Sequence, residues 1–256
     1  MQKEAYFRFY AELNDFLPKE KRQQRFEFSF SGSPAIKDSI EAIGVPHPEV
    51  DLVLVNGASI TFDYRLKDKD EVSVYPVFEL LNISEINHLR PKPLRITKFI
   101  TDVNLGKLAK KLRLLGFDTA LVGQVSEDEI VQNAVTEKRI ILTRNAGLLK
   151  IKTVTHGYWV RSTEPVRQVA EVTHKFDLIE NIKPFSRCSV CNGRIEQVEK
   201  SLVEHEIPPM TSKHFNEFYQ CQSCKHVYWK GSHYKKISLF IANLESQKST
   251  DELEPA

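Results

Sequence analysis

The sequence predicts a mixed α/β chain built from three segments of different character. Residues 25–30 (RFEFSF) alternate apolar and polar side chains, which is the period of a half-buried strand. Residues 95–180 alternate apolar strand-like runs with amphipathic stretches, which favours a parallel sheet covered by helices. Two Cys-x-x-Cys pairs beyond residue 184 indicate a small metal-held module. A chain of 256 residues, 41% of them hydrophobic, can supply two or three packed cores.

The first segment, residues 1–81, is expected to be a small α+β domain. Strands are predicted at 5–10, 25–30, 51–55 and 71–77, with a turn at Asn56-Gly57 and a helix at 35–43 that ends at Gly44. This order resembles the ubiquitin-like β-grasp fold, in particular that of small sulfur-carrier proteins. Those carriers act through a C-terminal Gly-Gly tail that the segment lacks. The resemblance therefore implies a docking module for a protein partner, with a structural cap as the alternative.

The second segment, residues 95–180, follows an expected linker at 82–94, where prolines stand among polar residues. Strands are predicted at 96–101, 117–122 and 139–143. One helix carries an apolar stripe and stops at Gly116, and another opens at a Ser126/Glu129 capping box. The side chains of this second helix that are expected to face inward are Ile130, Ala134 and Val135.

The third segment, residues 184–240, holds all four cysteines of the chain. They form the pairs Cys188/Cys191 and Cys221/Cys224, with residues 192–220 between them. Each pair can bind Zn²⁺ from a tight turn, and two turns complete a tetrahedral four-thiolate site of the zinc-ribbon kind. Because such a site has no open position, the predicted Zn²⁺ is structural rather than catalytic.

Basic and aromatic side chains surround the cysteine pairs, including Arg187, Trp229 and His233. Such interleaving is typical of a surface that stacks single-stranded nucleic acid, and packing in the small ribbon core is the alternative.

The distribution of charge along the chain also favours a nucleic-acid partner. Residues 1–94 carry 12 Lys/Arg against 15 Asp/Glu, residues 95–240 carry 23 against 15, and residues 241–256 carry one against four. The net +2 thus hides a basic body between acidic ends, which favours a nucleic-acid partner, although many enzymes are mildly basic without one.

The chain is expected to be cytoplasmic and not to be a membrane protein. No apolar run approaches the roughly 18 residues of a membrane span, and the first residues lack the pattern of a signal peptide. Four cysteines in such a chain are poor candidates for a disulfide framework. The last dozen residues are expected to form a disordered acidic tail.

Carboxylates at the carboxyl end of the predicted sheet are candidates for a second metal site. Asp102 directly follows an apolar strand, and Glu127 and Asp128 open a helix that could approach it. A metal-dependent phosphodiesterase needs such acids, because Mg²⁺ and Mn²⁺ prefer oxygen ligands. Acids in the first turn of a helix also stabilise it through its dipole, so a purely structural role for Glu127 and Asp128 is the alternative.

Several motifs carry a more specific resemblance. Residues 101–119 (TDVNLGKLAKKLRLLGFDT) resemble the opening of the Mut-seven C-terminal RNase domain, a branch of the PIN-like nucleases, and residues 139–149 (RIILTRNAGLL) resemble its second signature. Residues 185–192 (FSRCSVCN) and 221–233 (CQSCKHVYWKGSH) match its zinc-ribbon ending. Residues 44–51 (GVPHPEVD) and 55–57 (VNG) match the ubiquitin-like leader of the bacterial version. The resemblance covers nearly the whole chain.

The resemblance implies a PIN-like RNase fold at 95–180 whose acids hold Mg²⁺ or Mn²⁺ for RNA cleavage. By position these acids are Asp102, Glu127 with its neighbour Asp128, and position 145. The family motif has Asp at that third position, whereas this chain has Asn145, which offers a carbonyl oxygen but no charge. Asp118 is a candidate to compensate, as is Asp128.

The expected function is therefore a metal-dependent ribonuclease whose zinc ribbon grips RNA while Arg113 and Arg144 steer phosphate. The first alternative is a catalytically weak or inactive RNA-binding adaptor, because of Asn145. A third possibility is a β-grasp protein that docks on a sulfur-transfer or conjugation enzyme through residues 1–80.

Overall fold

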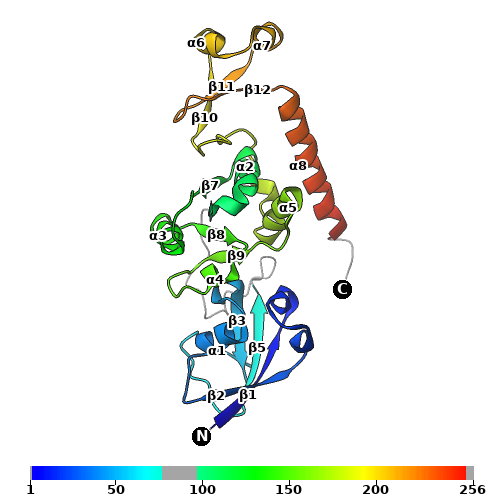
Figure 1. Ribbon diagram of the computed structural model, residues 1–256. Coiled ribbons are helices and arrows are strands. Elements are labelled where there is room, and N and C mark those ends of the chain that lie inside the picture. Colours follow the sequence, from blue (N-terminus) through cyan, green and yellow to red (C-terminus); the bar gives the residue numbers. More distant parts are fainter. Residues whose placement is uncertain (1, 77–96, 252–256) are drawn as a thin grey trace. The chain divides into compact units, whose positions relative to one another are not determined.

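The computed structural model of the chain describes residues 2–76 and 97–251 (Figure 1). The predicted linker at 82–94 and the last position of the strand predicted at 71–77 lie outside the described residues. The chain divides into two compact units. The first unit comprises Met1–Ile96 and Ser126–Trp159, and the second comprises Thr97–Val125 and Val160–Ala256.

A five-stranded sheet forms the N-terminal part of the first unit. Its elements are β1 (Gln2–Phe9), β2 (Phe26–Ser31), α1 (Ile36–Ile43), β3 (Val50–Val55), β4 (Ala58–Ser59) and β5 (Glu71–Pro76). The strand order is β2-β1-β5-β3-β4, with β1 parallel to β5 and the other pairs antiparallel. This arrangement of five strands and one helix confirms the predicted ubiquitin-like β-grasp fold.

Alternation along the strands builds the core of this sheet. Phe7 and Phe9 on β1 are buried on one face, where they meet Ile36 and Ile40 of α1. Burial of each such side chain contributes about 1.5–3 kcal/mol. Gly44 ends α1 with φ 131°, a conformation that side chains with a Cβ rarely adopt, and thus confirms the predicted stop.

Buried Asp70 locks the chain just before β5. Only 4% of the residue is exposed, and its carboxylate accepts hydrogen bonds from Asn56 Nδ2 at 3.0 Å, the Tyr64 hydroxyl at 3.0 Å and the Lys67 backbone N–H at 2.8 Å. Asn56 and Gly57 both have positive φ, as the predicted tight turn between β3 and β4 requires. The turn and the strand that follows are therefore tied together by one satisfied carboxylate.

The remainder of the first unit consists of α3 (Glu127–Glu137), β8 (Ile140–Thr143), α4 (Ala146–Leu149) and β9 (Gly157–Trp159), with β8 parallel to β9. The Ser126 hydroxyl caps α3 by accepting from the Glu129 backbone N–H at 3.3 Å, which is the expected half of the capping box. Ala134 faces inward as predicted, but the prediction for Val135 was wrong. Val135 is 49% exposed because the next residue along a helix lies about 100° further round.

Contacts within the first unit join its two stretches of chain. The Glu49 carboxylate accepts from the Trp159 backbone N–H at 2.5 Å, and the Trp159 ring packs on Phe16 with centroids 4.9 Å apart. His47 Nε2 lies 2.6 Å from the Val154 carbonyl oxygen. These contacts fix the end of β9 beside the ubiquitin-like sheet.

The second unit begins with β6 (Lys98–Thr101), α2 (Gly106–Leu114), β7 (Asp118–Leu121) and α5 (Pro165–Lys175). β6 and β7 are parallel, as are β8 and β9 of the first unit, so these two pairs have the expected direction. α2 buries Leu108 and Leu112, and Gly116, with φ 97°, follows its C-cap residue Leu115. A Cβ at Gly116 would lie 2.2 Å from the Lys183 carbonyl oxygen, so the predicted helix stop is also a close backbone approach.

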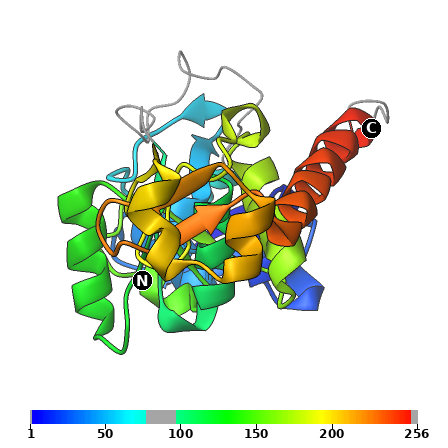
Figure 2. The same cartoon turned by 90° about the horizontal axis from the view of Figure 1, so that it is seen from above.

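A small antiparallel sheet follows in the second unit. Its strands have the order β10-β11-β12, and two short helices connect β10 to β11 along the chain. Figure 2 shows these helices, in gold, on either side of β11. Val203 of the first helix packs against Phe218 of β11. The bounds are β10 (Ile195–Val198), α6 (Lys200–Val203), α7 (Pro209–His214), β11 (Phe218–Cys221) and β12 (Val227–Trp229).

The long helix α8 (Ser232–Asp251) ends the described chain and runs beside α5 in Figures 1 and 2. The prediction of a disordered tail from 245 was wrong up to 251, and residues 252–256 lie outside the described residues. Leu244 gives the helix an anchor, since only 2% of it is exposed. Among residues 2–76 and 97–251, no helix combines the length and apolar composition that a membrane crossing requires.

Candidate metal centre and nuclease site

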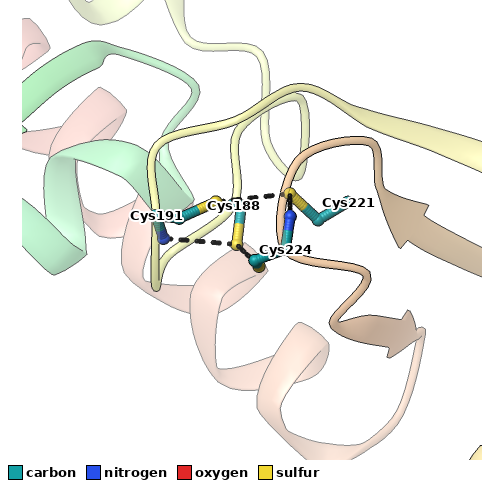
Figure 3. Close-up of side chains that lie close together, drawn as sticks. All are labelled: Cys188, Cys191, Cys221 and Cys224. Atoms are coloured by element: carbon teal, nitrogen blue, oxygen red, sulfur yellow. Dashed lines mark hydrogen bonds between the residues drawn. The ribbon is translucent and has the colours of Figure 1, made fainter.

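Four cysteine side chains meet between the turn that precedes β10 and the turn that follows β11 (Figure 3). Their sulfur atoms all lie within 4.8 Å of one another, with 3.6 Å between Cys188 and Cys224 and 3.4 Å between Cys191 and Cys221. A tetrahedral Zn²⁺ with Zn–S bonds of 2.3 Å needs sulfur atoms about 3.8 Å apart. The four cysteines therefore form a cluster able to bind a metal such as zinc.

The two cysteine turns repeat one backbone design. Asn192 and Lys225, the residues after each pair, have φ of 69° and 62°. Their backbone N–H groups donate to the carbonyls of Cys188 and Cys221 at 2.9 and 3.0 Å. Within each turn, the N–H of the second cysteine points at the sulfur of the first at 3.5 Å. Aligned N–H dipoles of this kind favour negative sulfur, which is the form that binds metal.

The thiols of the cluster differ in how readily they ionise. Burial raises the pKa of Cys188, but hydrogen bonds from the Tyr228 hydroxyl and from backbone N–H groups outweigh it and lower the pKa to about 6. A backbone hydrogen bond lowers the pKa of Cys224, yet burial and the neighbouring thiols raise it to about 12. The Cys188 thiolate therefore forms easily, whereas the Cys224 thiolate forms with difficulty unless a cation is present. A divalent cation at the centre of the cluster would stabilise both thiolates.

Arg113 has a different place from the one predicted. It was expected to steer phosphate, but only 5% of it is exposed, and its guanidinium points into the second unit. Nε donates to the Thr119 carbonyl at 2.8 Å, and one Nη donates to the carbonyls of Ser189 and Val190 at 3.3 and 2.8 Å. Arg113 thus ties α2 to the first cysteine turn, because its five donors can serve several carbonyls at once.

Asp118 and Arg187 are also engaged in this connection. Asp118 accepts from Arg187 at 3.1 Å and from Asn192 Nδ2 at 2.7 Å, and Asn192 Oδ1 accepts from the Thr119 backbone N–H at 3.0 Å. Asp118 therefore ties β7 to the first cysteine turn, and its role as a compensating acid stays a prediction. The hydrogen-bonding roles of Asn192 and Tyr228 were missed in the sequence, although Asn192 directly follows Cys191 and Tyr228 stands four residues after Cys224.

The remaining predicted RNA contacts lie in both units. Arg144 of the first unit is exposed, and its carbonyl accepts from Trp159 Nε1 at 3.1 Å. Trp229 is partly exposed and packs against the core of the small sheet around Phe218. His233 lies on α8, and its side chain is outside the described part of the structure. RNA binding by Arg144, Trp229 and His233, and by Arg187 of the first cysteine turn, stays a prediction.

Asp102 stands at the carboxyl end of β6, in the second unit. The residue is half-buried, and its Oδ1 accepts from the Asn104 backbone N–H at 2.8 Å. This bond caps a 3-10 turn, Val103–Leu105, that leads directly into α2. The expected position after a buried strand is therefore confirmed, with a local capping role added to it.

Glu127 and Asn145 come together in the first unit. Asn145 Nδ2 donates to Glu127 Oε1 at 2.7 Å, while Asn145 Oδ1 accepts from the Gly147 backbone N–H at 2.9 Å and so caps α4. Asp128 is exposed next to Glu127 in the first turn of α3. Within the described residues, the four cysteines are the one group of three or more His, Cys, Asp or Glu side chains that lie close enough together to hold a metal ion. The grouping of Asp102 with Glu127, Asp128 and Asn145 stays a prediction.

A ubiquitin-like sheet, parallel α/β strand pairs and a four-cysteine ribbon together define a multidomain α/β protein with a metal-binding module. Residues 97–241 match the family described as the Mut7-C RNAse domain, and residues 2–82 match the one described as Mut7-C ubiquitin. Because the first match covers more than half of the chain, the protein belongs to the Mut7-C RNase family, as the sequence motifs indicated. Comparison with curated proteins and with solved structures found no match. The family indicates a nuclease-like function.

Proposed function

We propose that this protein is a ribonuclease that depends on a divalent metal ion. The match of residues 97–241 to an RNase family carries the proposal. Asp102, at the end of β6, and Glu127 with Asp128, at the start of α3, would supply the carboxylate oxygens that Mg²⁺ and Mn²⁺ prefer. In this chemical sense the residues present fit a hard divalent cation. The bound ion would activate water and stabilise charge on the scissile phosphate.

Asn145 would act as a positioning residue for Glu127. Its carbonyl oxygen already accepts the Gly147 N–H, so hydrogen bonding places its NH₂ group toward Glu127. The amide would hold the Glu127 carboxylate in one orientation without adding charge. A site in which an amide replaces one acid binds Mg²⁺ more weakly than the fully acidic site, so cleavage should need a high metal concentration.

Cleavage of labelled RNA by the purified full chain tests this proposal. Single-stranded and structured RNA would be incubated with Mn²⁺ or Mg²⁺, and with EDTA in parallel. We expect metal-dependent cleavage that Asp102→Ala and Glu127→Gln reduce at least about a hundredfold, and that Glu129→Gln, a matched change on the same helical turn, leaves intact. Equal cleavage by Asp102→Ala and the wild type would refute the assignment.

A non-catalytic RNA-binding adaptor is the second candidate, and one observation favours it. The 2.7 Å bond between Asn145 and Glu127 satisfies the Glu127 carboxylate without a cation. In that case RNA binding should survive Asp102→Ala and fall as salt rises. Asn145→Asp would place two carboxylates against each other, a repulsion that a cation relieves. A gain of Mn²⁺-dependent cleavage in this variant supports the adaptor, whereas cleavage by the wild type excludes it.

The cysteine cluster would hold Zn²⁺ in a structural role. Four protein ligands complete a tetrahedral shell, and binding free energy of the metal becomes folding free energy of the ribbon. Metal analysis of the purified chain should give one Zn²⁺ per chain. Loss of the metal on Cys221→Ser with an unchanged fold of the small sheet would contradict a structural role.

The ubiquitin-like sheet, which indicates protein interaction, would dock a protein partner, and the ribbon would grip RNA. We also propose a cytoplasmic location, because the four cysteines are free thiols and disulfides are rare in that compartment. Affinity capture with and without residues 1–81 tests the docking role. An identical set of bound proteins in both samples would contradict it.

A further inference from the structure

We propose that a groove between α5 and α8 binds one nucleotide of single-stranded RNA, with the base on Phe240 and the phosphate at Arg167. The inference rests on the proposed ribonuclease function and adds a subsite to it. The groove has a volume of about 260 Å³. Its lining consists of Val166, Arg167, Ala170, Phe240, Asn243 and Leu244.

The walls of the groove suit a base rather than a bulkier ligand. Sites for drug-sized molecules usually start near 300 Å³, so this cavity is of the right size for a smaller planar group. Val166 and Leu244 give the lining apolar side chains, and the Phe240 ring supplies a π-face on which any base can stack. Asn243 adds an amide to the lining, a group that can hydrogen-bond with the edge of a base.

The charge around the groove suits a phosphate. Lys111 of α2 lies with Nζ 5.5 Å from the centroid of the Phe240 ring, and Lys107 stands one turn earlier on the same helix. Arg167 is exposed at the start of α5. Glu164 caps α5 beside them and accepts the N–H groups of Val166 and Arg167. Glu171 stands one turn beyond Arg167 on α5 and accepts from the backbone N–H groups of Arg161 and Ser162. Three cations against these two acids leave a net charge of +1.

The position of the groove connects it to the candidate acid. α2 packs against α5, and α2 begins directly after the turn that Asp102 caps. A strand whose phosphates follow Lys107 and Lys111 would run along α2 between the groove and Asp102. An acidic peptide could use the same cations, but it would gain nothing from the Phe240 ring. The ring beside the cations therefore favours single-stranded RNA.

Fluorescence anisotropy with a labelled oligouridylate tests the subsite in the full-length Asp102→Asn chain. Phe240→Leu keeps an apolar side chain, of smaller volume, but removes the ring, so we expect the Kd to rise roughly 5- to 150-fold. Phe240→Tyr should restore binding. Arg167→Gln should weaken binding and lower the slope of log K against log salt by about one. Leu239→Ala, a change at the neighbouring exposed position on α8, should bind like the parent.

Two competitors and one comparison decide the outcome. Inorganic polyphosphate carries no base, so it should bind the parent and Phe240→Leu with the same affinity in the competition assay. Unchanged oligouridylate binding by Phe240→Leu would overturn the subsite, as would displacement by polyglutamate that is as effective as displacement by RNA. If the wild type cleaves RNA while Phe240→Leu binds normally, the ribonuclease proposal survives and the subsite fails. If the parent binds no RNA, both fail.

Discussion

Replacing Arg113 by Met should destabilise the second unit and weaken Zn²⁺ binding without removing the aliphatic stem that packs in the interior. Arg113 donates to two carbonyls at 2.8 Å and to a third at 3.3 Å. A hydrogen bond from a charged donor contributes about 1.5–3 kcal/mol, so the two short bonds together predict a loss of about 3–6 kcal/mol. Against a typical domain stability of about 5–15 kcal/mol, this is a large fraction.

The effect should be largest at the cysteine turn. Two of the three acceptors are the carbonyls of Ser189 and Val190, which lie between the ligands Cys188 and Cys191. Without their donor the turn loses its tie to α2, so the sulfur atoms should be held less firmly. Arg113→Lys keeps one donor group, so its stability and its Zn²⁺ affinity should lie between those of Arg113→Met and the wild type.

Urea unfolding followed by tryptophan fluorescence measures the loss in free energy of unfolding, because Trp229 lies on β12 next to the second cysteine turn. Zn²⁺ release to a chromogenic chelator gives the second readout. Lys110→Met, on the exposed face of the same helix, is the matched control and should change neither. If Arg113→Met were as stable as the wild type but lost RNA affinity, Arg113 would be a phosphate contact and its structural role would be refuted.

Three further predictions concern the local structure of the chain. Gly116→Ala should cost at least about 2 kcal/mol in chemical unfolding, since its φ is 97° and a Cβ would meet the Lys183 carbonyl; stability equal to the wild type would contradict this. Ser126→Ala should cost about 1 kcal/mol by removing the cap of α3, whereas Ser126→Asp should not. Hydrogen bonds from the N–H groups of Val166 and Arg167 lower the pKa of Glu164 in the folded chain. The ionised carboxylate should therefore stabilise the fold fully above the ordinary carboxyl pKa, and this stabilisation should disappear as the pH falls through the lowered pKa. Glu164→Gln should therefore reduce the acid dependence of unfolding, and an unchanged pH profile would count against it.

Elements with strong local signals could be predicted from the sequence. The alternation of residues 25–30 and the Asn56-Gly57 turn specified the ubiquitin-like sheet, because side-chain period and positive φ are local properties. Two Cys-x-x-Cys pairs specified the metal cluster because few arrangements use four thiols at that spacing. Helix stops at Gly44 and Gly116 followed from the same local reasoning.

Features that depend on packing could not be predicted in this way. A guanidinium in a basic helix looks like a phosphate contact, and only the three-dimensional approach of the first cysteine turn shows that Arg113 is buried. The helix through residue 251 depends on anchors such as Leu244, which an acidic composition conceals. The bond from Asn145 to Glu127 joins residues 18 apart, and no sequence period indicates it.

The most direct test of the account is the rate at which the purified full chain cleaves single-stranded RNA in Mn²⁺, measured beside Asp102→Ala. We predict that the wild type cleaves the RNA, that EDTA stops the cleavage, and that the variant is slower by at least about a hundredfold. Identical rates for the two proteins, or RNA left intact by the wild type at high Mn²⁺ concentration, would contradict it.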